Sequence, residues 1–352
     1  WLLENFWWGS VFYINIPVVI VAIVATVLLV PESRDETTPR LDIVGLLLSI
    51  ATISALVVTI IEAPVHGWTA AWTLAGFAIA GAVGSVFVWW EQRNPHPLLP
   101  VRIFQNLRFS AASVSVTAAF FALFGFVFLI TQYFQLVRGY TPLDAGLRTL
   151  PVAFAIAVAS MLSPRLVERI GTTIVVAGGL TSMALGFLWV SFASVETPYL
   201  EIVFQMVLLG AGLGATTAPA TESIMGSLPA EKAGIGSAVN DTTRELGGTL
   251  GVAVVGSVFS SVYIASLADG ELFGRLPQGA QEATEESVVA AGRIAPELGT
   301  AAPQFLTEVS DAFLSGLGIA CLVVSGVAFA GAMFALRFLP ARGDEGGDGT
   351  VT

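Results

Sequence analysis

The chain has 352 residues, of which 55% are hydrophobic and only 12% are charged, and its mean hydropathy is +0.80. Soluble globular domains carry about 25% charged residues, so the composition excludes an ordinary soluble domain and predicts a multi-pass helical membrane protein. The net charge of −11, with one lysine and no basic patch, argues against nucleic acid as a partner, while one cysteine and two distant histidines leave no metal-ligand spacing.

The apolar residues fall into nine runs, each close to the roughly 20 residues that a helix needs to cross the hydrocarbon core of a bilayer. The runs are continuous, whereas the strands of a membrane barrel would alternate apolar and polar residues. No motif of enzyme chemistry interrupts them. We therefore expect an all-α membrane bundle of about nine transmembrane helices, at 11–30, 43–61, 72–90, 109–135, 146–162, 174–193, 202–222, 246–267 and 313–338.

The only long polar insert separates the last two runs. Residues 265–310 are rich in acids, and we expect an acidic external loop with one or two short surface helices. This loop is either a solvated cap without function or a functional element, and the sequence alone leaves both open. We expect the last transmembrane helix at 311–339 and a disordered tail at 340–352, because the tail is polar and acidic.

The positive charges predict the orientation in the plasma membrane, because cytoplasmic loops are enriched in Arg and Lys. A cytoplasmic C-terminus places eleven of the 15 cations inside: Arg34, Arg40, Arg93, Arg102, Arg108, Arg165, Arg169, Lys232, Arg244, Arg337 and Arg342. The outside set is then Arg138, Arg148, Arg275 and Arg293. This orientation also places Trp1 outside with no signal peptide before it, so we expect a fragment that lacks its N-terminal part.

A charged cluster leads into the glycine-rich eighth run. Asp241, Arg244 and Glu245 are spaced three and four residues apart, so on a helix Arg244 can pair with either acid. Such a cluster fits an inner gate that breaks when the bundle rocks, or a static anchor of the helix at the membrane edge. We prefer either to a proton carrier, because a neighbouring arginine keeps a carboxylate ionised.

Small residues follow the cluster. Gly247 and Gly251 form a GxxxG pattern that lets helices approach closely, and Gly248 and Gly256 extend the same surface. Tight packing and a sliding hinge are compatible interpretations. In the seventh run, Pro219 and three glycines, at 210, 212 and 214, predict a helix that breaks easily, as transporters use at midplane sites.

Two further features are candidates for the substrate path. Glu222, at the inner end of the seventh run, either titrates or faces substrate, or simply marks the helix end. The fourth run is unusually aromatic, and Phe124, Phe128, Gln132 and Gln135 combine apolar walls with amides that suit hydrophobic or cationic substrates. Contact of these aromatic residues with lipid is the alternative.

Three stretches carry a resemblance to one family. FWWGSVFYINIPV at 6–18 resembles the signature that opens the sixth span of drug:proton antiporters of the major facilitator superfamily. SPRLVERIGTT at 163–173 resembles a degenerate form of that superfamily's short cytoplasmic loop. SLPAEKAGIGSAVNDTTRELGGTLGVAVVGS at 227–257 is similar to the approach to the thirteenth span in its fourteen-span branch, the EmrB/QacA type.

The resemblance implies that the nine runs are spans six to fourteen, with 1–108 holding the end of the N-terminal half and two linker spans and 109–264 the C-terminal helix bundle. Trp8-Gly9-Ser10 is similar to members that export methyl viologen and quaternary ammonium compounds. The family's proton-coupling acid, fourth-span basic residue and antiporter glycine motif belong to spans that this chain lacks, so none of them is carried over. Runs 151–162 and 246–267 contain no acid, which argues against divalent cations as substrates.

The resemblance further implies multidrug efflux: export of hydrophobic, cationic, drug-like compounds in exchange for protons, by alternating access. It implies a monomer in the lipid bilayer, with the proton gradient in place of a cofactor and no enzyme activity, and we expect the fragment alone to be inactive. A dedicated exporter of a metabolite or antibiotic and a proton symporter are alternatives. A membrane scaffold or sensor that transports nothing is an alternative of another class.

Overall fold

The computed structural model describes residues 1–29, 42–229 and 233–340, and every regular element in these ranges is a helix. The elements before the central bundle are α1 (Leu2–Asn5), α2 (Ser10–Tyr13), α3 (Asn15–Leu29), α4 (Ile43–His66), α5 (Ala71–Arg93) and η1 (Val101–Gln105). The elements that follow are α6 (Leu107–Gln132), η2 (Tyr133–Val137), α7 (Pro142–Ile170), α8 (Thr172–Val190), α9 (Tyr199–Met225), α10 (Ala233–Ala268), η4 (Phe273–Arg275), α11 (Gln278–Glu286), α12 (Val288–Ile294), η5 (Ala295–Ala301) and α13 (Ala302–Phe338).

Within these ranges, nine helical segments are long and apolar enough to cross a membrane, and each corresponds to one of the nine predicted runs. The prediction of an all-α membrane bundle is confirmed. Several helices are longer than their apolar runs: α10 begins at Ala233 and α13 at Ala302. Hydropathy locates only the part of a helix that needs lipid, whereas polar turns continue the helix wherever tertiary contacts support them.

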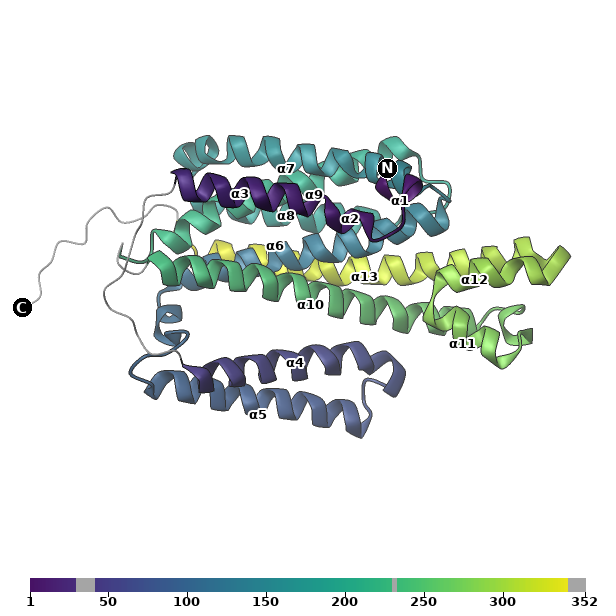
Figure 1. Cartoon of the computed structure of the whole chain (residues 1–352), viewed down its shortest axis with the longest axis horizontal. Coiled ribbons are helices and arrows are strands. Elements are labelled where there is room, and N and C mark those ends of the chain that lie inside the picture. Colours follow the sequence, from purple (N-terminus) through teal and green to yellow (C-terminus); the bar gives the residue numbers. More distant parts are fainter. Residues whose placement is uncertain (30–41, 230–232, 341–352) are drawn as a thin grey trace, which may run out of the picture.

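Six of the described helices form the central bundle, with α6 in its middle. α6 packs against α9, α10 and α13, while α7 and α8 flank α9, and α8 also packs against α13 (Figure 1). The α4–α5 hairpin lies beside this bundle, and its main contact with the bundle runs through α10. At that contact the hydroxyl of Ser257 donates a hydrogen bond to the carbonyl oxygen of Ile60 at 2.5 Å.

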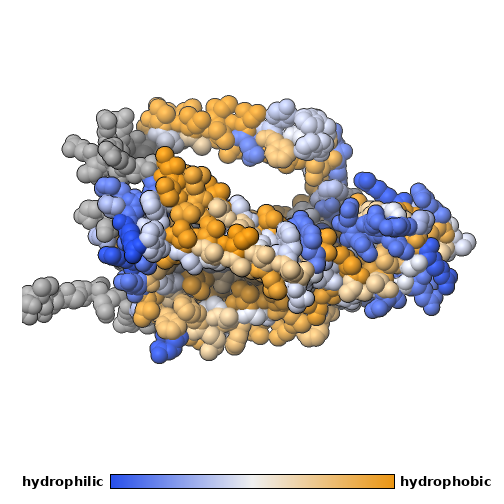
Figure 2. Space-filling view, turned by 90° about the horizontal axis from the view of Figure 1, so that it is seen from below, coloured by the Kyte–Doolittle hydropathy of each residue, from blue (hydrophilic) through white to orange (hydrophobic). Residues whose placement is uncertain are grey.

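The surface shows the banding expected of a membrane protein. Figure 2 shows an apolar belt along the helices and hydrophilic residues gathered at the two ends. We call the end where α5 and α9 finish and α6 and α10 begin the inner end, following the orientation predicted above, and the opposite end the outer end. Of the predicted inner cations, Arg34, Arg40, Lys232 and Arg342 lie outside the described residues.

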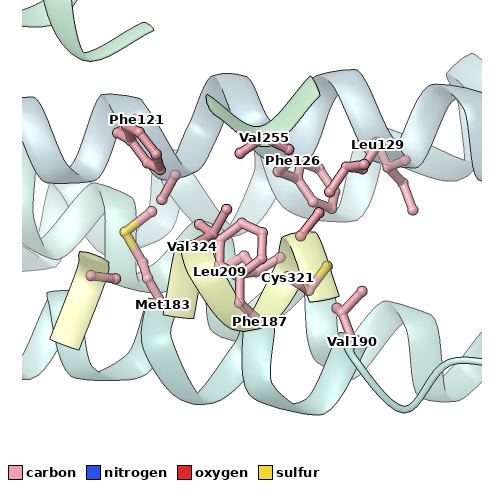
Figure 3. Packing of buried hydrophobic residues seen from close by; sticks show 14 of the residues in the cluster. Phe121, Phe126, Leu129, Met183, Phe187, Val190, Leu209, Val255, Cys321 and Val324 are labelled. Atoms are coloured by element: carbon pink, nitrogen blue, oxygen red, sulfur yellow. The ribbon is translucent and has the colours of Figure 1, made fainter. Parts of the chain in front are cut away.

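The buried core lies around α6, which is apolar on all sides, as a helix in the middle of a bundle must be. Figure 3 shows Phe121, Phe126 and Leu129 of α6 facing side chains from several other helices. These partners are Met183, Phe187 and Val190 of α8, Leu209 of α9, Val255 of α10, and Cys321 and Val324 of α13. This core is the shared packing surface of α6, α8, α9, α10 and α13.

Glycines bring the backbones of these helices into direct contact. A Cβ at Gly247 would lie 2.5 Å from the carbonyl oxygen of Thr117, and one at Gly251 would meet the carbonyl oxygen of Phe121. The GxxxG surface of α10 therefore lies against the α6 backbone. Gly210 and Gly214 of α9 contact α7 in the same way, and Gly212 contacts Gly179 of α8.

Two predictions concern segments that the structure describes in full. α9 runs unbroken from Tyr199 to Met225 with Pro219 inside it, so the helix predicted to break easily is continuous in this structure. The insert predicted at 265–310 contains the short helices α11 and α12, and both of its ends are helical, because α10 extends to Ala268 and α13 starts at Ala302. Apart from Pro340, the predicted disordered tail lies outside the described residues.

Candidate functional site

A pocket of about 250 Å³ opens at the outer end of the bundle, between α6, α10 and the junction of α11 with α12. Three of the four residues predicted for the substrate path, Phe128, Gln132 and Gln135, lie in its wall. The fourth, Phe124, does not line it, and its ring lies instead against the Gly248 position of α10. The remaining lining residues are Thr131, Leu136, Gly256, Phe259, Ser260, Tyr263, Glu285, Glu286, Ser287, Val288 and Val289.

The wall of the pocket is aromatic because α6 and α10 each contribute rings that face the same space. Phe128 meets Phe259 edge to face, with 6.5 Å between ring centroids, and Phe259 stacks on Tyr263 at 5.7 Å. Gly256 leaves room beside Phe128, since a Cβ there would be 3.6 Å from the ring. Such a wall offers both stacking and cation–π contacts to a flat or positively charged molecule.

The rim of the pocket is acidic. Glu285 and Glu286 end α11, and they line the pocket together with the amide side chains of Gln132 and Gln135. No arginine, lysine or histidine is among the lining residues that the structure describes. Two carboxylates above an aromatic wall, with no basic side chain in the wall, give the pocket a preference for cations.

The acidic insert is held over the pocket by specific contacts. The hydroxyl of Tyr263 donates a hydrogen bond to the carbonyl oxygen of Thr284 at 3.1 Å, which ties α11 to α10. Glu308 of α13 accepts hydrogen bonds from the backbone N–H groups of Leu272 and Phe273 at 3.1 and 3.4 Å. Because several of its apolar side chains join the core, the insert is a packed cap rather than a loose loop.

Sequence reasoning missed most of the lining residues, among them the two acids of the rim, Glu285 and Glu286, and the rings of Phe259 and Tyr263. The acidic insert stands out by its composition, but nothing in the sequence indicates that Glu285 and Glu286 lie near Gln132. The available signal is the pair of aromatic residues in α10 at a helical spacing from Gly256. That spacing places them on one face without saying which helix that face meets.

A second polar site lies at the inner end, around Arg244. Its Nη2 donates a hydrogen bond to the hydroxyl of Thr221 on α9 at 3.1 Å, and that hydroxyl lies 3.1 Å from the amide oxygen of Asn240. The guanidinium also sits over the ring of Phe120 on α6, 5.2 Å from its centroid. Arg244 therefore connects α6, α9 and α10 at one point.

The predicted pairing of Arg244 with Asp241 or Glu245 is wrong for this structure. Within the described ranges no ion pair joins the arginine to either acid. The three residues lie close along one helix, but Arg244 shares its face with Gly247 and Gly251 and turns toward α6, while both acids are exposed. The buried Nε of Arg244 has no hydrogen-bond partner among the described residues.

Glu222 is exposed in the last turn of α9 and lies next to Thr221, the residue that contacts Arg244. Glu222 therefore lies at the end of the bundle where α9 finishes, and no side-chain contact among the described residues assigns it a role. Among the described residues, no group of three His, Cys, Asp or Glu side chains gathers as metal ligands.

Comparison with known proteins gives a consistent family. The family model described as "Major Facilitator Superfamily" matches residues 1–252. Over 332 residues the chain is 32% identical to "Multidrug resistance protein Stp" of Mycobacterium tuberculosis. This alignment covers 92% of this chain and 62% of Stp. It is 32% identical to "Multidrug efflux pump LfrA" of Mycolicibacterium smegmatis, covering 95% and 66% of the two chains. It is 31% identical to "Methyl viologen resistance protein SmvA" of Salmonella typhimurium, covering 81% and 57%.

The fold likeness agrees with the family match. A crystal structure of a bacterial homologue of the human lysosomal transporter Spinster, inward-facing and unoccupied, matches with a TM-score of 0.54 at 14% identity. The match covers 79% of this chain and 61% of that one. The chain thus spans 57% to 66% of the length of these three sequence relatives.

Proposed function

The chain belongs to the major facilitator superfamily, and from that membership we propose that the protein containing it exports hydrophobic, positively charged compounds in exchange for protons. Export proceeds by alternating access, in which the bundle rocks about a binding site between its halves. Relatives named for multidrug resistance, multidrug efflux and methyl viologen resistance support this substrate class. Coupling to protons rests on the resemblance in three sequence motifs.

The outer pocket is the observation that carries this proposal. It combines an aromatic wall, Phe128 with Phe259, and an acidic rim, Glu285 with Glu286. A hydrophobic cation loses its water on entering such a pocket and gains stacking, cation–π and charge interactions in return. A metabolite without positive charge would gain only the first of these.

The arrangement of the helices supports a place in the fourteen-span branch, with the nine spans as numbers six to fourteen. In this numbering α4 and α5 are the two linker spans, which fits a hairpin that stands beside the bundle. The six spans from α6 to α13 then form the C-terminal half, and residues 1–29 end the N-terminal half. The predicted cytoplasmic C-terminus in the plasma membrane follows from the same numbering.

A dedicated exporter of one metabolite or antibiotic is a second candidate, because the pocket is small and its rim is specific. A symporter or a membrane scaffold has no comparable support from the geometry. An efflux assay in a bacterium that lacks its own drug pumps separates these functions. We expect cells expressing the protein that contains this chain to lose ethidium faster than cells with an empty vector, and a protonophore to abolish the difference.

The same assay distinguishes the substrate classes. Equal export of several unrelated hydrophobic cations supports multidrug efflux, whereas export of one compound alone supports a dedicated exporter. If every tested cation leaves the cells at the empty-vector rate, the proposed function is wrong.

Arg244→Ala is expected to lower ethidium efflux about 3- to 10-fold while leaving membrane insertion intact. The variant loses a hydrogen bond to Thr221 and a cation–π contact with Phe120, each of which contributes about 1 kcal/mol. These contacts join three helices at the inner end, where a gate must open and close. Transport should be measured at matched protein levels in the membrane.

Glu245→Gln is the matched control for Arg244→Ala. It changes a charge on the same helix, one residue away, at an exposed position where the described residues include no ion-pair partner. The control should transport normally. Normal efflux in Arg244→Ala would remove Arg244 from the gate.

A further inference from the structure

Two carboxyl groups meet at the inner end of the α4–α5 hairpin, away from the outer pocket. Asp42 caps the start of α4, accepting a hydrogen bond from the backbone N–H of Gly45 at 2.8 Å. Its two oxygens also accept from the indole N–H of Trp90 at 3.1 and 3.0 Å. The Asn94 amide donates to its Oδ2 at 2.5 Å. Asp42 is thus the acceptor for three separate donor groups.

Glu91, in the last turn of α5, is only 3% exposed and has few partners. Its Oε2 accepts a hydrogen bond from the backbone N–H of Leu99 at 2.9 Å. Its Oε1 is fully buried and has no hydrogen-bond partner among the described residues. A buried carboxylate oxygen without any donor is costly, so this atom needs a ligand.

Gly45 shows where the free oxygen of Glu91 points. A Cβ at this position would meet Oε1 of Glu91, and it would lie 2.6 Å from Oδ2 of Asp42. The two oxygens therefore converge on the same small space, left open by the missing side chain of Gly45. A Cβ at Gly45 would contact both oxygens at once, which places the two carboxyl groups beside each other.

No basic side chain in the part of the chain that the structure describes neutralises the pair. No nitrogen of an arginine, lysine or histidine in the described ranges lies within 4.0 Å of either carboxyl group. Arg93 of α5 sits over the ring of Trp89 at 4.3 Å, and the exposed His96 and Arg102 belong to the connection toward α6. Two buried carboxylates this close repel strongly unless one of them takes a proton.

We propose that Asp42 and Glu91 bind one proton between them. The proton is carried on Oε1 of Glu91, and this O–H group donates a hydrogen bond to Oδ2 of Asp42. Binding converts Glu91 to the neutral acid and lowers the charge of the pair from two negative charges to one. The remaining charge stays on Asp42, where three donor groups stabilise it. Burial raises the pKa of the Asp42 carboxyl, but the hydrogen bonds from Gly45, Trp90 and Asn94 outweigh burial and hold that pKa below its usual value.

The bound proton stabilises the place where the start of α4 meets the connection from α5 to α6. Asp42 fixes the start of α4, while Glu91 holds Leu99 in the connection that leads through η1 into α6. Loss of the proton would push the two carboxylates apart and release both contacts. Binding of the proton thus stabilises the connection between the α4–α5 hairpin and α6. This role requires no drug substrate.

Infrared spectroscopy of the purified, membrane-reconstituted protein containing this chain tests the site directly, because a carboxylic acid has a C=O band that a carboxylate lacks. We expect such a band at neutral pH, its loss in Glu91→Gln, and its shift in Asp42→Asn, where the acceptor changes. Glu62→Gln is the matched control, since this acid of α4 is 44% exposed. The proposal is overturned if the neutral-pH spectrum of Glu91→Gln equals that of the parent.

Two further variants keep the test decisive. Gly45→Ala places a methyl group between the carboxyl groups and should shift the band in the same way as Asp42→Asn. Arg40 precedes Asp42 but lies outside the described residues, so Arg40→Gln tests whether an arginine neutralises the pair instead. A carboxylic acid band that appears only in Arg40→Gln would overturn the shared proton, and an unchanged band supports it.

Amide hydrogen exchange gives an independent measurement. Once corrected for intrinsic rates, exchange in the connection 94–106 should rise when the pH is raised into the alkaline range, because Leu99 is released. In Glu91→Gln, whose neutral amide cannot lose a proton there, exchange should stay independent of pH. Equal pH dependence in parent and variant would contradict the proposal.

Discussion

The double variant Gly247→Ala with Gly251→Ala is expected to leave almost no folded protein in the membrane. The two glycines lie one turn apart on α10, and both press against the backbone of α6. A Cβ at Gly247 would lie 2.5 Å from the Thr117 carbonyl oxygen, and one at Gly251 would be 3.0 Å from the Cα of Phe121. Backbone atoms cannot rotate away as a side chain can, so the helices must separate.

The expected cost is large relative to the stability of a typical protein. Overpacking a tight contact costs about 1–3 kcal/mol at each position, and total stabilities are about 5–15 kcal/mol. Separation of α6 from α10 also loosens the core around Val255, which packs between them. The measurement is the amount of monodisperse protein after extraction in mild detergent, together with its melting temperature.

The same helix offers a matched control. Gly234→Ala with Gly256→Ala makes the same chemical change twice on α10, but a Cβ at Gly234 meets nothing within 4 Å and one at Gly256 is in ordinary contact with Phe128. This variant should fold like the parent. Equal stability of the two double variants would show that the close approach of α6 and α10 is unimportant for the fold.

The helices could be predicted from the sequence because the bilayer imposes its thickness on every span. A continuous run of about 20 apolar residues is rare outside a membrane span, so each of the nine spans found in the described residues is recognisable from its own sequence. The ends of the helices were less predictable, since α10 begins well before its apolar run and α13 does as well. Their polar turns are stabilised by contacts with neighbouring elements, and a hydropathy average contains no information about such contacts.

Side-chain partners depend on which face of a helix meets its neighbour, and sequence spacing does not specify this. Asp241 and Arg244 are close enough to pair on an isolated helix, yet Arg244 reaches across to Thr221 and Phe120. Asp42 and Glu91 likewise share a corner only because α4 and α5 fold back on each other. The outer pocket needs α6 with η2, α10 and the cap of α11 and α12, so only its wall on α6 and η2 could be predicted.

Neutralising the acidic rim, in the double variant Glu285→Gln with Glu286→Gln, is expected to weaken the apparent affinity for cationic substrates about 5- to 30-fold. This expectation rests on the proposed export of hydrophobic cations. Each carboxylate is partly open to water, so it contributes about 0.5–1 kcal/mol to binding a positive charge, and 1.4 kcal/mol corresponds to a factor of ten. The aromatic wall stays intact, because Phe128 and Phe259 belong to other helices.

The charge of the substrate decides whether this mechanism is correct. A neutral hydrophobic substrate gains from the rings but not from the carboxylates, so its export should be unchanged in the same variant. The KM for ethidium should rise while the maximal rate stays near that of the parent. A fall in the maximal rate for both substrates would instead indicate damage to the cap that Tyr263 ties down.

Glu271→Gln with Glu282→Gln is the control that isolates position from net charge. Both acids lie in the same acidic insert and are exposed, but neither lines the pocket. This variant loses the same two charges from the outer end, so it removes the same long-range attraction for cations. If its KM for ethidium rises as much as that of the rim variant, the insert acts by its overall charge, and the pocket is not a binding site. If only the rim variant is affected, the two carboxylates beside the aromatic wall contact the cation themselves.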